Sequence, residues 1–300
     1  MKKKVLITGG SGLLAVNWAL SIRDEYEVTL LLHQRKIYLK GVKTDIANIS
    51  SLDECKAVLD RHKPDVVIHT AGLTSVEKCE ENPNLAQEVN VDLAKNIAIA
   101  CDKQNVKLVH ISTDHLFSGE GSFVTEESNA TPINNYAKTK LEGERQVQKN
   151  CKDALIIRTN FFCWGTKYRQ SFSDFIISKL RNNESIDLFS DVFFTTILAE
   201  ELAQKVHQLI DAKASGVFNV VGSECMSKYE FGVKLANCFG LDANLINEIS
   251  INDKPNLVKR PKDMSLSNKK ICKTLNCKMP SIDEQLQTLK QQESDSGINH

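Results

Sequence analysis

The sequence lacks a net charge and a long apolar run, and each absence excludes a class of function. Its 38 Lys and Arg balance its 38 Asp and Glu, so no broad electrostatic field indicates nucleic acid or a membrane surface as partner. No apolar run approaches the roughly 20 residues that span a bilayer. The apolar run after Met1–Lys4 is too brief for a signal peptide. We therefore expect a cytoplasmic protein whose ligand is neutral or is a locally bound anion.

The sequence also lacks the patterns that hold a metal. Its seven histidines show no HxH or HExxH spacing, and Cys272 with Cys277 has no second pair that would complete a zinc site. The nine cysteines are an odd number scattered through apolar segments. Such a distribution is typical of reduced thiols in a core rather than of a disulfide framework. We expect neither a structural nor a catalytic metal.

What is present is a regular alternation of short apolar segments with stretches of helical length. The strand-like segments are Val5–Ile7, Val28–Leu32, Asp65–Thr70, Lys107–Ser112 and Leu155–Arg158. The helical stretches between them include Leu52–Arg61, Asn84–Gln104 and Tyr136–Lys149. Parallel strands need a crossover connection, which is usually a helix. The sequence therefore predicts an α/β fold with a doubly wound parallel sheet of the Rossmann type.

After about Gly165 the pattern is less regular and predicts a smaller substrate lobe. Its expected elements are helices at Tyr168–Asn183, Thr195–Ala212, Lys228–Phe239 and Ile282–Gln291 and a strand at Gly216–Val221. We assign residues 1–165 to the dinucleotide-binding domain, with about 195–222 returning to it. Residues 166–194 and 223–292 form the lobe, and the polar residues 293–300 form a frayed tail.

A glycine turn follows the first predicted strand. Gly9, Gly12 and Ala15 are spaced three residues apart in the segment Thr8–Ala15. Gly9 permits a tight turn, Gly12 lets the backbone approach a pyrophosphate, and Ala15 lets the helix pack on the strand. The free amides of the helix's first turn, around Ser11, Leu13 and Leu14, would then face the phosphates.

Several other segments end at the same edge of the predicted sheet. Ala71–Leu73, Thr113 and Arg158 each follow a predicted strand. Because the carboxyl ends of parallel strands meet at one edge, we expect these residues and the glycine turn to converge on one crevice.

The residues after the second predicted strand indicate which nicotinamide cofactor binds. His33–Lys36 contains no carboxylate that would bind a ribose 2'-hydroxyl, and Arg35 can make a charge-assisted contact to a 2'-phosphate. The prediction is NADP(H); the alternative is that Arg35 is an ordinary solvated charge. Asp45 and Ile46, after the expected third strand, are placed to meet the adenine, although Asp45 could instead cap the next helix.

Tyr136 and Lys140 stand four residues apart on a predicted helix, so their side chains share one face. A tyrosine is a poor acid or base at neutral pH unless a nearby cation stabilises its phenolate. Lys140 is placed to do that, and no other tyrosine in the chain is followed at this distance by lysine. The pair predicts a proton-transfer site.

With these motifs in order, nearly the whole chain resembles the extended short-chain dehydrogenase/reductases, and most closely the group of dTDP-4-dehydrorhamnose reductases. The segments that carry the resemblance are Thr8–Ala15, Thr70–Pro83, Val89–Val91, Ile111–Gly119, Pro132–Lys140, Ile156–Phe162 and Lys259–Lys270. The resemblance implies reduction, by NADPH, of the 4-keto group of a nucleoside-diphosphate-linked deoxysugar in carbohydrate biosynthesis. It also implies a possible homodimer.

The resemblance further implies roles for particular residues. Thr113, Tyr136 and Lys140 would form the catalytic set, with Ser112 as the fallback for Thr113. Tyr136 would donate a proton, and Lys140 would hold the nicotinamide ribose and lower the pKa of Tyr136. The cofactor would meet Gly9, Ser11, Gly12, Leu13, Leu14, Arg35, Asp45, Ile46, Ala71, Gly72 and Leu73.

The substrate side departs from the family's pattern. His115 stands where these reductases typically carry tyrosine, and Phe161 where they carry tryptophan. Both would face the sugar, together with Thr113 and Asp114. His115 is expected to contact the sugar, with proton donation as its alternative. Arg260 is a candidate for the diphosphate. Thr74 and Ser75 would touch the sugar or else open the following helix.

Two rival functions use the same fold. Some relatives are regulatory subunits that bind NADP and a partner enzyme without reducing a sugar. Others are sugar-nucleotide epimerases or dehydratases that retain bound NAD. The intact set of Thr113, Tyr136 and Lys140 argues against the first, and the cofactor content of the purified protein would distinguish the second.

Overall fold

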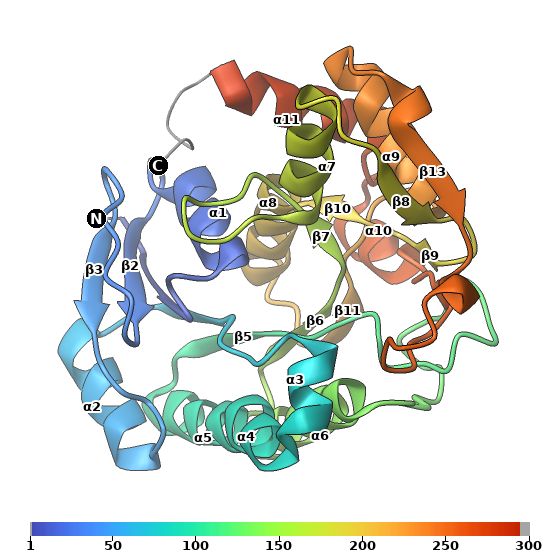
Figure 1. Cartoon of the computed structure of the whole chain (residues 1–300). Helices are drawn as coiled ribbons and strands as arrows, with labels where there is room; N and C mark the ends of the chain where they lie inside the picture. The colour runs from blue at the N-terminus through green and yellow to red at the C-terminus, as the bar shows by residue number, and fades with distance from the viewer. Residues whose placement is uncertain (1, 295–300) are drawn as a thin grey trace.

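A seven-stranded sheet forms the centre of the protein (Figure 1). The computed structural model describes residues 2–294. The sheet runs in the order β11-β6-β5-β4-β1-β2-β3, and all neighbouring strands are parallel. Its strands are β1 (Lys4–Thr8), β2 (Glu27–Leu32), β3 (Lys43–Ile46), β4 (Val66–His69), β5 (Lys107–Ile111), β6 (Leu155–Arg158) and β11 (Gly216–Asn219). The order reverses between β1 and β4, which confirms the predicted doubly wound fold.

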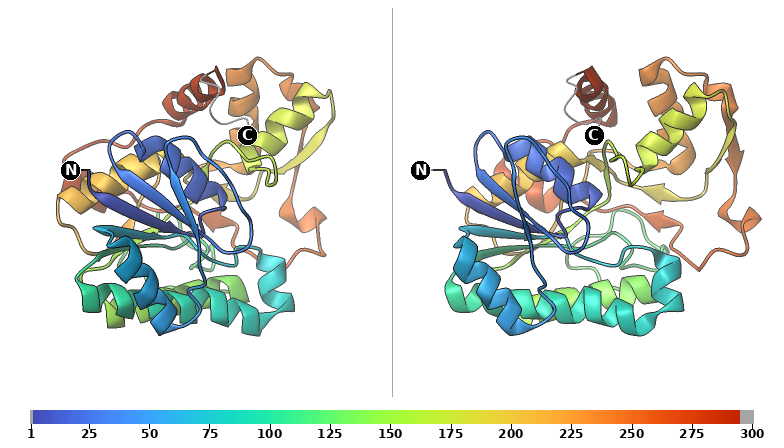
Figure 2. Two further views of the ribbon diagram at one scale, coloured as in Figure 1. Left: turned by 90° about the vertical axis from the view of Figure 1, so that its left-hand side faces the viewer. Right: turned by 60° about the vertical axis from the view of Figure 1, so that its left-hand side comes forward.

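Helices cover both faces of this sheet (Figure 2). One face carries α1 (Leu13–Ile22), α8 (Ala199–Asp211) and α10 (Lys269–Leu275), and the other carries α2 (Leu52–His62), α5 (Leu93–Gln104) and α6 (Asn135–Asn150). Successive residues of a strand point to opposite faces of the sheet and pack in two different apolar cores. Val5 and Ile7 pack with α1 and α8, whereas Leu6 packs with α2 and α5. Each such buried side chain contributes about 1.5 to 3 kcal/mol, so the register of the sheet is strongly fixed.

A third apolar core lies beyond the carboxyl edge of the sheet. It includes Phe194 and Phe231, whose rings meet edge to face at 5.7 Å. Its helices are α7 (Phe172–Arg181), α9 (Lys228–Phe239) and α11 (Ile282–Ser294). Its short strands are β8 (Ile186–Phe189) with β13 (Ile246–Ile249), and β9 (Phe193–Phe194) between β12 (Met226–Ser227) and β14 (Asp263–Met264). A further pair, β7 (Phe161–Phe162) with β10 (Ile197–Leu198), links this core to the sheet.

Two residues refine the predicted organisation of the chain. Ile271 of α10 packs in the core of the sheet, although its range was expected in the lobe. Glu293 belongs to α11 and pairs with Arg181 at 2.7 Å, so the predicted frayed tail does not begin there. Residues 295–300 of that tail lie outside the described residues. The boundaries of the two domains stay a prediction.

Most predicted helices are present, and three begin or divide differently. The expected Asn84–Gln104 helix consists of α4 (Pro83–Gln87), a π-helical turn (Glu88–Asp92) and α5. The expected helix from Tyr168 starts at Phe172, because Ser171 and Asp174 form a capping box there. The expected helix from Thr195 starts at Ala199, because Ile197–Leu198 pairs with β7. These differences place several side chains at the site.

The remaining elements are α3 (Val76–Glu81) and two 3₁₀ helices, Ala243–Leu245 and Ile251–Asp253. Within residues 2–294, no helix combines the length and apolar character needed to cross a membrane.

Candidate active site

A crevice of about 540 Å³ opens at the carboxyl edge of the sheet, between the sheet and the third core. Fifteen of the predicted site residues line it. They are Gly9, Ser11, Gly12, Leu13, Leu14, Arg35, Ala71, Gly72, Thr74, Thr113, Asp114, His115, Tyr136, Lys140 and Phe161. The convergence expected from the strand ends is therefore present, except for Leu73 and Arg158. Arg158 does not line the crevice but pairs with buried Glu144 at 2.8 Å.

The glycine turn has the geometry that a pyrophosphate needs. Gly9 has a φ of +66°, and a Cβ there would lie 2.8 Å from the backbone of Ala71. Gly12 donates to the Gly9 carbonyl at 2.8 Å and caps α1 without a side chain. The first-turn amides of α1 therefore remain available to an anion. These residues fit a dinucleotide phosphate.

A smaller apolar cavity of about 210 Å³ adjoins the glycine turn through Gly9 and Ala71. Leu32, Asn48 and Ile49 line it, which suits an adenine ring. The residues predicted for this role lie elsewhere. Asp45 is bound by Arg61 at 2.7 Å and His62 at 2.8 Å, and Ile46 is 46% exposed. Asp45 and Ile46 do not line this cavity, because β3 extends through Ile46 and the lining after this strand begins at Ala47. Asp45 is not a helix cap either, since Ser51 caps α2.

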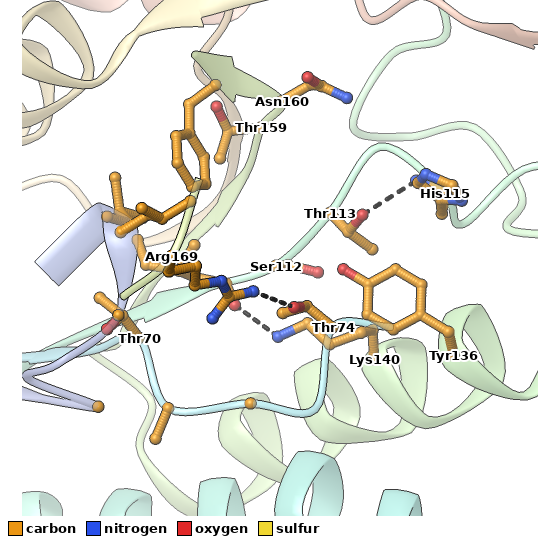
Figure 3. Close-up of a pocket in the computed structure, with 18 of the residues that line it drawn as sticks. Thr70, Thr74, Ser112, Thr113, His115, Tyr136, Lys140, Thr159, Asn160 and Arg169 are labelled. Atoms are coloured by element: carbon orange, nitrogen blue, oxygen red, sulfur yellow. Dashed lines mark hydrogen bonds between the residues drawn. The ribbon is translucent and has the colours of Figure 1, made fainter. Parts of the chain in front are cut away.

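Tyr136, Thr113 and Lys140 come together as predicted. Asn134 caps α6 by accepting from the Ala137 N–H at 2.9 Å, so the helix begins just before Tyr136. Tyr136 and Lys140 are buried on one face of α6, and Thr113 follows β5 opposite them. The Tyr136 hydroxyl lies beside Thr113 in the crevice, and the Thr113 hydroxyl accepts from the His115 N–H at 3.3 Å (Figure 3). The Lys140 ammonium donates to the Ile111 carbonyl at 2.6 Å.

The protonation states of this set are shifted by burial. Burial raises the pKa of the Tyr136 phenol, and the hydrogen bond with Thr113 acts in the opposite direction. Burial lowers the pKa of the Lys140 ammonium to about 8, and Glu144 opposes that shift. The prediction that Lys140 lowers the pKa of Tyr136 is wrong for this structure, in which Lys140 bonds to Ile111 instead. The Tyr136 phenol consequently keeps its proton at neutral pH.

The substrate side of the crevice is built around Asp114. Its Oδ2 accepts from Asn160 Nδ2 at 2.7 Å, and its Oδ1 accepts from the Thr113 hydroxyl at 3.3 Å. His115 Nε2 lies 3.9 Å from the same carboxylate, and its ring meets the Tyr136 ring edge to face at 5.5 Å. Burial lowers the pKa of His115, against the pull of Asp114. A neutral imidazole beside Tyr136 suits the predicted contact role.

A lysine that packs on the third core interacts electrostatically with Asp114. The Lys228 ammonium, at the start of α9, lies 3.3 Å from the centre of the Phe194 ring and 5.1 Å from that of Phe172. Burial lowers the pKa of Lys228 to about 8, and Asp114 opposes the shift. The sequence placed this residue only in a helix and gave no functional signal for it.

Three predicted residues bond elsewhere. Ser75 caps α3 by accepting from the Lys78 N–H at 3.2 Å, which is the alternative that the sequence left open. Leu73 faces away from the crevice and bonds to Asn90 through both its N–H and its carbonyl. Arg260 pairs with Glu77 and does not line the crevice, so its contact with a diphosphate stays a prediction.

Eight lining residues were not predicted as site residues. They are Thr70, Val76, Ile111, Ser112 (named only as a fallback), Thr159, Asn160, Tyr168 and Arg169. Asn160 could have been found, because it follows β6 as Thr113 follows β5. Tyr168 and Arg169 gave no signal, because they belong to a range that the apolar pattern assigned to a helix. Arg169 donates to Thr74 Oγ1 at 3.3 Å across the crevice (Figure 3).

The nine cysteines are free, and five of them are buried. Among residues 2–294, no three His, Cys, Asp or Glu side chains gather where they could hold a metal ion.

The parallel sheet, the glycine turn and the Thr113, Tyr136 and Lys140 set define an extended short-chain dehydrogenase/reductase. The chain belongs to the family described as "RmlD substrate binding domain", which it matches over residues 3–294.

Three relatives illustrate the range of this family. The "Probable low-salt glycan biosynthesis reductase Agl14" of Haloferax volcanii is 29% identical over 96% of this chain and 98% of its own. The crystal structure of dTDP-4-dehydrorhamnose reductase from Bacillus anthracis in complex with NADP is 25% identical. It superposes with a TM-score of 0.85 over 97% of this chain and 100% of its own. The methionine adenosyltransferase 2 subunit beta of Pongo abelii is 27% identical over 90% of this chain and 81% of its own.

Proposed function

We propose that this protein reduces the 4-keto group of a nucleoside-diphosphate-linked deoxysugar with NADPH. The observation that carries the proposal is that Thr113, Tyr136 and Lys140 come together in one crevice with the glycine turn. The likeness to dTDP-4-dehydrorhamnose reductase with NADP supports both the reaction and the cofactor.

The residues of the crevice have different roles in the proposed reaction. The nicotinamide of the cofactor supplies a hydride when it is bound. Tyr136 donates a proton to the oxygen that develops negative charge, and Thr113, oriented by Asp114, hydrogen-bonds the same oxygen. Lys140 binds the nicotinamide ribose and gives the site a positive charge. Because burial keeps Tyr136 protonated, the site favours reduction of a carbonyl.

The cofactor's remaining parts fit the rest of the edge. The glycine turn and the first-turn amides of α1 receive the pyrophosphate, and the cavity beside Asn48 and Ile49 receives the adenine. Arg35 lines the crevice after β2, where the chain offers no carboxylate, and we assign it to the 2'-phosphate.

The sugar is placed against Thr74, Asp114, His115, Asn160 and Phe161. His115 and Phe161 change the hydrogen bonds offered to the sugar relative to the reductases with tyrosine and tryptophan at these positions. A buried polar group left unpaired costs about 1 to 3 kcal/mol. The substrate is therefore a 4-keto deoxysugar nucleotide whose hydroxyls are placed to hydrogen-bond the His115 imidazole. A homodimer and a cytoplasmic location remain predictions.

A second function has one specific observation in its favour, the similarity to a subunit of methionine adenosyltransferase. In that case the crevice would bind NADPH for regulation of a partner enzyme, without turnover.

One experiment separates the two. Purified protein is mixed with NADPH and a panel of 4-keto sugar nucleotides, and the absorbance of NADPH is followed, with Tyr136→Phe as the control. Consumption that depends on one sugar nucleotide and on Tyr136 supports the reductase. Tight NADPH binding with no consumption across the panel, together with co-purification of a second enzyme, overturns it. Stoichiometric NAD in the purified protein would instead indicate an epimerase or dehydratase.

A further inference from the structure

The segment 165–171, between β7 and α7, reaches back over the cofactor side of the crevice. In Figure 1 it runs from the third core toward α1. Two backbone hydrogen bonds between Thr166 and Arg169, at 2.8 and 3.1 Å, close it into a tight turn. The Tyr168 hydroxyl donates to the Ser11 carbonyl at 3.0 Å, so the turn is tied to the phosphate-binding loop.

Arg35 lies on the ring of Tyr168. Its guanidinium carbon is 4.4 Å from the centre of that ring, in a cation–π contact. In the part of the chain that the structure describes, the Arg35 guanidinium makes no ion pair or hydrogen bond. A guanidinium stacked on a ring keeps its N–H groups for a phosphate, and the stacking removes freedom that the long side chain would otherwise lose on binding.

We propose that Tyr168 is a positioning residue for the recognition of the cofactor's 2'-phosphate. The Ser11 carbonyl fixes the Tyr168 ring, the ring fixes Arg35, and Arg35 binds the phosphate. This inference rests on the assignment of Arg35 under the proposed function. It adds that discrimination between NADPH and NADH depends on a segment contributed from beyond β7, far along the chain from Arg35.

A purely structural role for Tyr168 makes a different prediction. If Tyr168 only packs beside the pyrophosphate, its removal should weaken the binding of NADPH and of NADH equally, since both cofactors contain that group. If Tyr168 acts through Arg35, its removal should weaken the binding of NADPH alone.

The test measures the dissociation constants of NADPH and NADH by the fluorescence of the bound nicotinamide. The variants are Tyr168→Leu, Tyr168→Phe, Arg35→Leu and the double variant Arg35→Leu with Tyr168→Leu. Tyr38→Leu is the matched control, because Tyr38 is an 84% exposed tyrosine close to Arg35 in the chain and does not line the crevice. Thermal melting confirms that each variant is folded.

Tyr168→Leu should raise the dissociation constant of NADPH about 3- to 10-fold and leave that of NADH unchanged. Tyr168→Phe should keep part of the preference for NADPH. Its ring can still stack on Arg35, although it lacks the hydroxyl that bonds to the Ser11 carbonyl. In the Arg35→Leu background, Tyr168→Leu should have no further selective effect. An equal loss for both cofactors, or additive effects in the double variant, would overturn the inference while leaving the reductase intact. An Arg35→Leu variant with an unchanged preference would overturn the Arg35 assignment itself.

Discussion

Asn90 and Leu73 are joined by two hydrogen bonds that tie the π-helical turn to the loop at the crevice. The Leu73 N–H donates to Asn90 Oδ1 at 2.8 Å, and Asn90 Nδ2 donates to the Leu73 carbonyl at 3.1 Å. The same Nδ2 donates to Thr139 Oγ1 at 3.0 Å, next to Lys140. Asn90 therefore fixes the position of the 71–73 loop relative to α6, the helix that carries Tyr136 and Lys140.

Replacing Asn90 by alanine should weaken both the fold and cofactor binding. The change leaves the partly buried N–H of Leu73 unpaired and leaves its carbonyl with the Cys79 thiol, at 3.4 Å, as donor, and an unpaired group of this kind costs about 1 to 3 kcal/mol. Urea unfolding measures the loss of stability, and NADPH titration measures the binding. Asn96→Ala is the control, because Asn96 makes one exposed bond to the Ser50 carbonyl. If both variants lost the same stability and bound NADPH alike, the linking role of Asn90 would be refuted.

Tyr136→Phe should keep NADPH binding and lose most turnover. The ring and its packing remain, but the proton donor is gone, and positioned proton transfer contributes about 100- to 10,000-fold in rate. Single-turnover oxidation of NADPH with the preferred sugar nucleotide measures the loss. Thr113→Ser should be mild, because the hydroxyl survives, and Thr113→Val should be severe. Near-normal turnover in Tyr136→Phe would exclude its acid role.

Turnover should decline as the pH rises through about 8. The pKa of Lys140 is lowered to about 8 by burial, so above that value the ammonium loses its proton and its charge in the site. Lys228 has its pKa lowered to about 8 as well, so the pH profile needs two variants. Lys140→Met should be slow at all pH values and lack the decline. Lys228→Met should keep the decline of turnover as the pH rises through about 8. If this variant lacked the decline, the pH effect would belong to Lys228 instead.

The sequence predicts the parts of this site that follow regular strands, because a strand end has a definite place in a parallel sheet. Gly9 and Thr113 were found in this way, whereas Tyr136 was found by its spacing to Lys140 on a helix, and all three line the crevice. Asp45 was misplaced, because the pattern of apolar residues does not show that β3 runs through Ile46.

Other parts of the site depend on contacts between distant segments. Asn90 acts through a π-helical turn that a helical pattern hides. Tyr168 meets Ser11 and Arg35 only because a capping box at Ser171 delays the start of α7. The charge of Lys140 was expected to act on Tyr136, but burial of both groups outweighs it.

His115→Phe should change substrate binding more than the chemical step. Its ring packs on Tyr136 at 5.5 Å, and burial lowers its pKa, so under the proposed function it would contact the sugar as a neutral imidazole. Phenylalanine keeps the packing and loses the hydrogen bond. KM for the sugar nucleotide should rise about 5- to 100-fold with kcat nearly unchanged. Steady-state kinetics across the substrate panel measures the split. A collapse of kcat at constant KM would identify His115 as a proton donor instead.

The buried histidines His69 and His110 should make the protein sensitive to acid. Their rings stack at 5.5 Å between the sheet and α6, and neither nitrogen of His110 has a hydrogen-bond partner among the described residues. Burial lowers the pKa of His69 to about 3 and that of His110 well below its usual 6.5. Between these values the unfolded chain binds protons that the folded chain excludes. The free energy of unfolding therefore falls as the pH falls below about 6.5.

His110→Leu should lessen this sensitivity. Leucine fills a similar volume and removes two unpaired polar atoms, so the free energy of unfolding at neutral pH should stay the same or rise by up to about 1 to 3 kcal/mol. His69→Leu is the matched comparison, because His69 is hydrogen-bonded to Thr8 at 2.8 Å and its loss should destabilise at neutral pH. Urea unfolding from neutral pH toward about pH 4 measures both. A His110→Leu variant that loses stability as steeply in acid as the original chain would show that His110 is not the group that titrates.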